Sequence, residues 1–455
     1  MHFAIIASIP SQLKTSLMND PTTFKGWVDQ PDGRGTFDII WSSFITIFLS
    51  TWTCLHLNLP GPDEGIWKPV FRKFRWMVFT IFLPEFTLAL AGGQRANARR
   101  TTDALHGMGY SRWTTRHSFY ANMGGFILQP RDSTPFPIHG IHLVWLVKEG
   151  YLTIPEIGEE EIADKSKADL LTKLLVCGQT GWFVVHCLAR WKQKLPLTTL
   201  ELATITFVCC TWGIYGQWLK KPLDVERPTV LKIQASTEEI LVNAGPAAAK
   251  PYMQTPLDFV WDWHVSWTLD VQPYLHFRVD PRKRPIPRIL NDGFPWYDRA
   301  THVGIILFMI TFYGAIHVMG WNFTFPSSIE KILWRVSGLV ILCTTTVFCL
   351  LEFGWGIYRA WYSLRLNEQP IRPMSIFYVF TNRIEKIAGA NGLPVHDEKF
   401  DAELVTIGHI SVIVPLVVLY MLARIYVVGE ALASLRALPA GAYKDVDWTK
   451  FIPHY

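Results

Sequence analysis

The chain has 455 residues, of which 49% are hydrophobic, 14% are aromatic and only 18% are charged. Soluble domains carry about a quarter charged residues, and 20 tryptophans are unusual for them. The net charge of +5 is too small to indicate a nucleic-acid surface, and it fits loops beside anionic lipid headgroups. We therefore predict an all-α integral membrane protein, with the lipid bilayer as a partner and no nucleic acid.

Seven apolar segments approach the ~20 residues that a helix needs to cross ~30 Å of hydrocarbon. In chain order these predicted spans are 37–57, 76–93, 174–189, 197–219, 302–321, 334–355 and 404–423. Most have Trp, Tyr or Arg at one end, where amphipathic side chains anchor at the headgroup level. Seven crossings would place the three long connecting segments on the same side of the membrane as the N-terminus.

These spans divide the chain into eight parts. They are an N-terminal interfacial segment (1–36), a first transmembrane hairpin (37–93), an extramembrane segment (94–173), a second hairpin (174–219), an amphipathic and proline-rich loop (220–301), a third hairpin (302–361), a loop (362–403), and a last helix with the C-terminal tail (404–455). Within the fifth part, PLDFVWDWHVSWTLDV at 256–271 mixes aromatic residues with Asp and His over too few residues to span. It predicts an amphipathic helix at the membrane surface.

Ionisable residues inside the predicted spans are candidates for function, because each costs at least ~2.5 kcal/mol in hydrocarbon and usually faces a cavity or a partner. The catalytic candidates are Glu85, Glu201, Glu352 and His409. A carboxyl group in an apolar cavity tends to stay protonated and can act as a general acid. The alternative for Glu85 is a hydrogen bond to a neighbouring helix, since Pro84 frees a backbone carbonyl one turn back.

Depth along the predicted spans sorts these residues into two groups. We expect an inner group of Asp38, Glu352 and His409, and an outer group of Glu201, His186 and His317, with Glu85 able to join either. Candidates for substrate binding are Asp38, Trp182, Trp212, His317 and Trp355, because aromatic faces stabilise cations. The same tryptophans also pack ordinary helix bundles, and that alternative stays open.

Motifs for a bound cofactor are missing from the sequence. There is no HExxH, no GxSxG and no glycine-rich phosphate loop, and no CxxC pair for zinc, so we expect neither a metal nor a cofactor. Asp258 and Asp262 form a DxxxD, which can hold Mg²⁺ and a diphosphate in prenyltransferases, but no second acidic motif matches it.

Four phrases resemble a large group of multi-pass proteins of filamentous fungi: FDIIWSSFITIFLSTWTCLHLNLP at 37–60, DKSKADLLTKLLVCGQTGWFVVHCLAR at 164–190, WGIYGQWLKKPLDVERP at 212–228 and RIYVVGEALASLRALPAGAYKDVDWTKFIPH at 424–454. The group resembles membrane-bound terpene cyclases of meroterpenoid biosynthesis, which protonate an epoxide on a prenyl chain and guide ring closure. The resemblance implies an enzyme of fungal secondary metabolism in the endoplasmic reticulum membrane.

The expected function is thus a membrane-embedded terpene cyclase or isomerase that needs no cofactor. A buried carboxylic acid would protonate an epoxide or alkene of a lipophilic prenylated substrate. One alternative is a proton-coupled transporter or channel, because intramembrane acids and histidines also form proton relays. Another is a non-catalytic membrane scaffold. The sequence does not define an oligomeric state.

Overall fold

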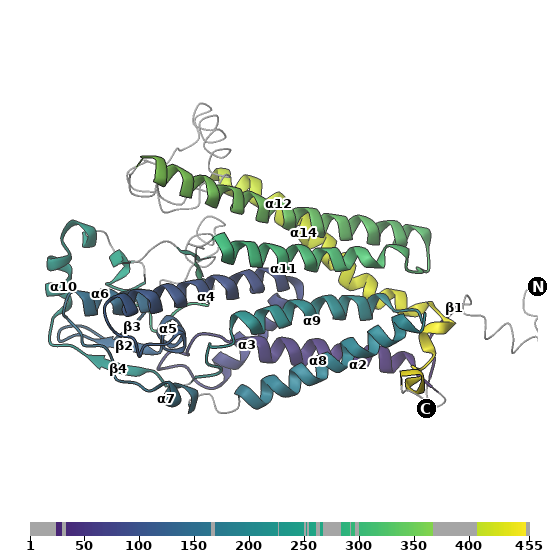
Figure 1. Cartoon of the computed structure of the whole chain (residues 1–455), viewed down its shortest axis with the longest axis horizontal. Helices are drawn as coiled ribbons and strands as arrows, with labels where there is room; N and C mark the ends of the chain where they lie inside the picture. Colours follow the sequence, from purple (N-terminus) through teal and green to yellow (C-terminus); the bar gives the residue numbers. More distant parts are fainter. Residues whose placement is uncertain are drawn as a thin grey trace, which may run out of the picture.

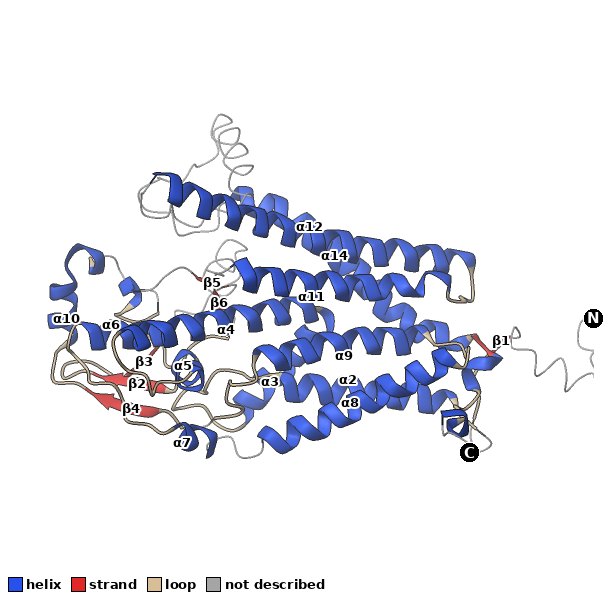
Figure 2. Ribbon diagram, in the orientation of Figure 1, coloured by secondary structure: helices blue, strands red, loops and turns tan. Residues whose placement is uncertain are grey.

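The computed structural model describes residues 24–29, 33–164, 169–225, 227–249, 252, 254–260, 264–266, 284–291, 293–295, 300–366 and 407–451. For 348–366 and 407–414 it describes the backbone alone. Most of the described chain is helical (Figure 2), so the predicted helical class is confirmed. Three small sheets add to the helices, and the prediction of an all-α fold did not include them.

Long helices run roughly along the longest axis and form a bundle (Figure 1). They are α2 (Thr36–Cys54), α3 (Trp67–Phe82), α4 (Pro84–Gly107), α8 (Asp169–Lys192), α9 (Thr199–Gln217), α11 (Ala300–Met319), α12 (Ser328–Leu366) and α14 (Ile407–Ala433). Three stretches in the described chain are long and apolar enough to cross a membrane, namely Thr36–Cys54, Leu171–Lys192 and Pro415–Arg436. A fourth is added if α3 and α4, bent by 114°, count as one span.

One end of the bundle holds both ends of the described chain, and we call it the terminal end. Strand β1 (Phe24–Lys25) pairs with β7 (Leu438–Pro439) in an antiparallel register, with Phe24 opposite Pro439. The side chain of Thr36, at the start of α2, lies 3.3 Å from the Tyr443 hydroxyl. The segments that flank the first and last long helices therefore meet at the same end.

The opposite end carries a small mixed domain, the lobe (Figure 1). Its sheet has the order β3-β2-β4, with β2 (Phe126–Gln129) antiparallel to β3 (Phe136–Ile138) and parallel to β4 (Thr229–Lys232). Helices α5 (Thr115–Asn122), α6 (Gly140–Lys148), α7 (Glu159–Asp164) and α10 (Thr237–Ala244) surround it. Apolar residues of these elements form a core separate from that of the bundle.

This arrangement corrects the predicted topology. The lobe, built from the first two of the three long segments, lies at the end opposite to β1 and β7, so these two segments do not share an end with the N-terminal strand (Figure 1). The third long segment lies largely outside the described residues. The second predicted span accounts for the difference, because it is broken at Pro84 and its two arms both reach the lobe end.

The amphipathic helix predicted at 256–271 is wrong for the residues that are described there. Asp258–Val260 form one 3₁₀ turn, and β5 (His264–Ser266) pairs with β6 (Gly293–Pro295). Alternation of aromatic and polar residues has the period of two that suits a strand. Asp258 accepts hydrogen bonds from the backbone N–H groups of Gln254 and Thr255, so it stabilises a local turn. Asp262 lies outside the described residues.

Candidate functional site

The break between α3 and α4 brings irregular backbone into the middle of the bundle. Leu83 adopts φ −133° and ψ 54°, which ends α3, and Pro84 then occupies the first position of α4. Proline disfavours a helical conformation at the preceding residue and is well suited to a helix start. The Ile81 carbonyl, left without a helical donor, accepts a hydrogen bond of 3.2 Å from Nη2 of Arg424 on α14. A side chain from the last long helix thus caps the break.

Glu85, the second residue of α4, lies beside this break and is only 5% exposed. The Tyr420 hydroxyl of α14 donates a hydrogen bond to its Oε1. Its Oε2 is buried and has no hydrogen-bond partner among the described residues. A buried carboxyl oxygen without a partner is costly, so it marks a place where a proton, a water or a ligand group would be stabilised.

Arg424 joins a histidine and a tyrosine of α11 in the same buried cluster. Its Nη1 lies 2.8 Å from Nε2 of His317, and its guanidinium carbon lies 5.3 Å from the centre of the Tyr313 ring. Since a guanidinium can only donate, Nε2 is the acceptor. The ring proton of His317 is then on Nδ1, which lies 3.2 Å from the Tyr313 carbonyl. His317 is therefore a neutral imidazole that orients Arg424.

We call Glu85, Tyr420, Arg424, His317 and Tyr313 the central cluster. All five side chains are buried, and they come from α4, α11 and α14. Among the described contacts, Arg424 and Glu85 form no direct ion pair. The cluster thus holds one acidic and one permanently cationic group, with Tyr420 bound to the acid and His317 to the cation. Such a charge pair in low-dielectric surroundings can stabilise charge that develops between them.

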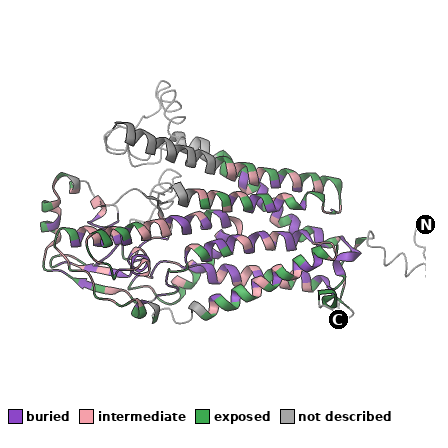
Figure 3. Ribbon diagram, in the orientation of Figure 1, coloured by how far each residue is buried: buried purple, intermediate pink, exposed green. Residues whose placement is uncertain are grey.

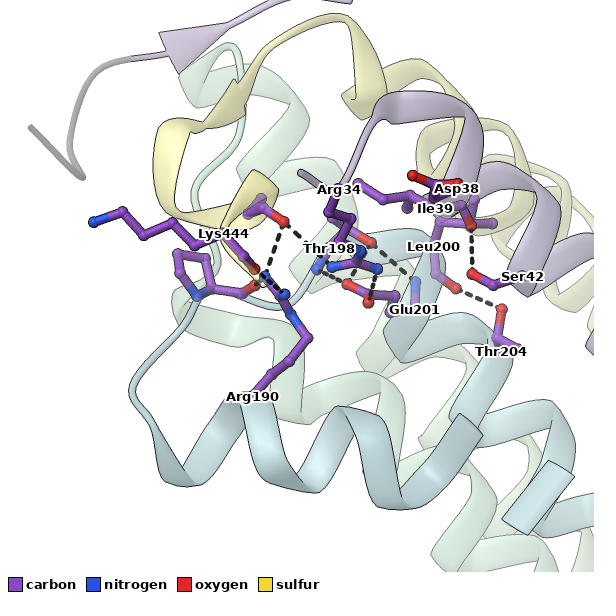
Figure 4. Close-up of polar contacts among 12 residues, drawn as sticks. Arg34, Asp38, Ile39, Ser42, Arg190, Thr198, Leu200, Glu201, Thr204 and Lys444 are labelled. Carbon is purple, nitrogen blue, oxygen red and sulfur yellow. Dashed lines mark hydrogen bonds and ion pairs between the residues drawn. The ribbon is translucent and has the colours of Figure 1, made fainter. Parts of the chain in front are cut away.

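Glu201, the second predicted acid, has a different environment at the terminal end (Figure 4). It is fully buried and forms an ion pair with Arg34. Its Oε2 accepts hydrogen bonds from the backbone N–H and the hydroxyl of Thr198, at 2.9 and 3.0 Å. Thr198 in turn accepts from the Glu201 N–H, which completes a capping box at the start of α9. With both oxygens accepting hydrogen bonds, this carboxylate acts as a structural anchor.

Arg190 extends the anchor to the C-terminal segment (Figure 4). Its guanidinium donates to the carbonyls of Lys444 at 2.7 Å and Ala442 at 2.9 Å. Arg34 also donates to the Ala442 carbonyl, at 3.2 Å. Two arginines from α8 and the N-terminal segment thereby hold the turn after β7 against the start of α9.

The structure separates the members of the predicted inner group. Asp38 accepts a hydrogen bond from the Gly35 N–H at the first turn of α2, at the terminal end. His409 begins α14 and lies about 36 Å along that helix from its terminal end. Glu352 lies about 33 Å along α12 from Glu330, which pairs with Arg436 near β7. Asp38 is thus not grouped with Glu352 and His409, whose side chains are not described.

The outer group is also divided. His317 belongs to the central cluster, whereas the His186 ring packs near Trp448 at 6.2 Å. Trp182 stacks on Trp448 and is 57% exposed, and Trp212 is 40% exposed and donates to Thr180. Because both tryptophans are exposed, they do not line an internal cavity. Exposed and buried residues along the helices of the bundle are coloured in Figure 3. The side chain of Trp355 is outside the described part of α12.

Three members of the central cluster were not predicted from the sequence. The last predicted span ended at residue 423, one residue before Arg424, because a window of apolar residues ends where a charge appears. In the structure α14 continues to Ala433. Tyr420 and Arg424 are four residues apart and share one helix face, which was the available signal. Tyr313 is four residues before His317 and shares its face in the same way.

A second buried polar cluster lies where the bundle meets the lobe. Lys221 follows α9 and is 3% exposed, and its Nζ donates to Gln94 at 2.8 Å and Asn58 at 3.4 Å. It also lies 4.8 Å from the centre of the Trp218 ring. Burial lowers the pKa of Lys221 to about 7. This amine can therefore change its charge near neutral pH.

These features define a helical protein with a broken helix, a buried acid beside a buried arginine, and membrane-length apolar helices. The chain belongs to a family of unknown function, DUF8562, whose model matches residues 5–244 and 298–455. The matched residues include the whole central cluster and most of the lobe. Comparison with curated proteins and with solved structures finds no match.

Proposed function

We propose that the protein is a multi-pass membrane enzyme in which Glu85 donates a proton to a lipophilic, prenylated substrate. The observation that supports it most is the buried Glu85 carboxyl, with Tyr420 on one oxygen and no described partner on the other. Ionisable residues at this depth in a membrane protein are usually functional. The reaction is the terpene cyclisation or isomerisation that the sequence resemblance implies, and the endoplasmic reticulum location rests on the same resemblance.

The proposed topology has six crossings, by α2, α8, α9, α11, α12 and α14. Helices α3 and α4 form a re-entrant pair that enters and leaves at the lobe end. Two contacts support this: the Leu59 N–H, just before α3, donates to the Met123 carbonyl of the lobe, and Thr102 near the end of α4 contacts Ser118 of α5. Non-helical backbone at membrane depth is tolerated where protein surrounds it, as at Leu83.

The proposed chemical step is an isomerisation. Glu85 transfers the proton on Oε2 to an epoxide oxygen, the C–O bond breaks, and the oxygen becomes a hydroxyl. Alkene electrons close a C–C bond on the cationic carbon. The last cation loses a proton to the Glu85 carboxylate, which restores the acid and leaves the mass unchanged. Arg424 would stabilise the carboxylate between the two transfers, and the Tyr313 ring would face the cation.

The test is a search for isomers. Microsomes that contain the protein are incubated with epoxidised prenyl-phenols and analysed by liquid chromatography and mass spectrometry. We expect a new product of unchanged mass, lost in Glu85→Gln and kept in Glu156→Gln, an exposed lobe position. Loss of the product in Glu352→Gln with retention in Glu85→Gln would assign the acid to Glu352. No product from any substrate with folded protein would reject the cyclase.

A proton-coupled transporter is the second candidate, because two observations favour it. Broken helices near the membrane centre form substrate and ion sites in many transporters. The six proposed crossings would also allow paired repeats, which an odd number of helices fits poorly. Proteoliposomes loaded with a pH-sensitive dye separate the candidates: a proton flux that needs Glu85 supports transport, whereas an isomer without flux supports the enzyme.

A further inference from the structure

The first half of α3 forms a surface that the central cluster does not use. Residues 72–75 precede the second predicted span, 76–93, but in the structure they belong to the amphipathic helix α3. Its buried face carries Lys73, Met77 and Thr80. Its opposite face exposes Trp67, Phe71, Phe74 and Val78 at helical spacing, with Trp67 82% exposed.

A groove of about 720 Å³ lies along this exposed face. It is lined by the aromatic residues Trp52, Trp67, Phe71 and Phe74, by Val70, and by the basic residues Lys68, Arg72, Arg75 and Arg288. The groove thus combines an apolar floor with a cationic rim.

Charge in the groove is unbalanced. Glu64 pairs with both Arg72 and Arg288, the latter at 3.2 Å. One carboxylate therefore serves two guanidinium groups. Lys68 and Arg75 are exposed on the same helix, and no ion pair of theirs is found in the described part of the chain. The groove accordingly carries a net positive charge that an anion would neutralise.

The groove also lies where a headgroup would be. Helix α3 begins beside the lobe. Just before the helix, the Leu59 N–H donates a hydrogen bond to the Met123 carbonyl of the lobe, and Gly61 packs near Pro287. From there it runs toward the break at Pro84, inside the bundle. Aromatic and basic side chains together are typical of the headgroup level of a bilayer.

We infer that this groove binds an anionic phospholipid, with the phosphate at Lys68 and Arg75 and the first acyl carbons over Phe71 and Phe74. Charge complementarity selects the anion, and the exposed aromatic face selects a lipid over free phosphate. The inference rests on the proposed bilayer location of the bundle. It is independent of the chemistry at Glu85.

The test uses the full-length protein reconstituted in nanodiscs of phosphatidylcholine with a minor fraction of phosphatidic acid. Native mass spectrometry counts the anionic lipids retained after release from the disc. We expect Lys68→Gln/Arg75→Gln to retain roughly 25-fold less phosphatidic acid, since each of the two basic residues near a membrane surface contributes about a fivefold factor. The matched control is Lys148→Gln/Lys232→Gln, which removes two exposed charges from the lobe.

Two further arms decide the source of the phosphate and guard against misfolding. Lys68→Arg/Arg75→Lys keeps the charges and should retain the lipid as wild type does. Phe71→Gln/Phe74→Gln keeps the cations and should lose the lipid. Equal retention by wild type and Lys68→Gln/Arg75→Gln would overturn the inference. Displacement of the lipid by inorganic phosphate alone would assign the groove to free phosphate. Failure to enter nanodiscs would instead contradict the proposed bilayer location.

Discussion

The Tyr420 hydroxyl of α14 donates a hydrogen bond to the Glu85 carboxyl of α4. A residue of the last long helix therefore holds the acid beside the broken helix. One turn later on the same helix, Arg424 donates a hydrogen bond to the Ile81 carbonyl. Helix α14 therefore positions the acid and caps the break at the same time. A change on this one helix face should affect both.

Tyr420→Phe removes the only described hydrogen-bond donor of Glu85. We expect a loss of about 1–3 kcal/mol in stability, because a buried carboxyl is left without its partner. Thermal unfolding in detergent measures it. In combination with Glu85→Gln the second change should cost much less, since the interaction is already weakened. Tyr110→Phe in the lobe is the control, because it is partly buried and no hydrogen bond of its hydroxyl is found in the described part of the chain. Equal costs for the two tyrosines would contradict a special role for Tyr420.

Glu201→Ala should destabilise the terminal end strongly. Arg34 would then be buried without its carboxylate, which costs about 3–5 kcal/mol, and α9 would lose half of its capping box. Arg34→Met/Glu201→Leu should recover part of this loss because no uncompensated charge stays buried. The measurement is the unfolding midpoint of Arg34→Met, of Glu201→Leu and of the variant that carries both changes. Purely additive losses would show that the pair is not coupled.

Lys221 should make stability depend on pH. Its folded pKa of about 7 is below the ordinary value of 10.5. Between these two pH values the lysine is protonated in the unfolded chain and neutral in the folded protein. Stability then rises as pH increases from about 7 to 10, and the cost of burying the charge is fully present below pH 7. Lys221→Met should raise the unfolding midpoint at pH 6 and flatten the rise. A midpoint that falls between pH 7 and 9 in wild type but not in the variant would contradict this sign.

Gly125→Ala tests the lobe independently of the bundle. A Cβ at this position would lie 2.5 Å from the Tyr120 carbonyl oxygen and 2.6 Å from its ring. Backbone would have to move, so we expect a loss of roughly 1–3 kcal/mol or more. Gly107→Ala is the matched control, because its added Cβ meets nothing within 4 Å. Protection of lobe amides from hydrogen exchange is the measurement, and equal protection in the two variants would argue against the close contact.

An even number of crossings predicts that both ends of the chain face one compartment and the lobe faces the other. Epitope tags fused to the two ends should be cleaved together by protease added to sealed microsomes. A tag inserted at the turn between β2 and β3, beside the exposed Thr134, should show the opposite sensitivity. End tags of opposite sensitivity would support seven crossings.

The sequence predicted the helical class because long apolar runs are a local signal. It did not predict that the lobe lies opposite to the terminal end, since Pro84 was weighed as a local defect in one span and not as a point where the chain reverses. The expected pairing of Asp38 with Glu352 and His409 failed for the same reason, because depth was assigned from a topology with seven crossings. Glu85 is buried in the structure, and its role as an acid stays a prediction.

The partners of Glu85 were beyond reach of a local pattern. Tyr420 is 335 positions away from it, and nothing near either residue indicates the contact. Glu201 was chosen as a candidate because it lies in an apolar run. Thr198, three residues earlier, gave the pattern of a capping box. That pattern indicated a structural role.

The anchor formed by Arg34, Glu201 and Arg190 has a consequence for synthesis. Arg34 is translated 408 positions before Ala442, whose carbonyl it binds. The first helix would therefore enter the membrane long before the contacts that hold its N-terminal end exist. A truncated chain that stops before β7 would leave Arg190 without the Lys444 and Ala442 carbonyls and Arg34 without the Ala442 carbonyl. These unused donors are a mark by which quality control could distinguish incomplete copies from finished ones.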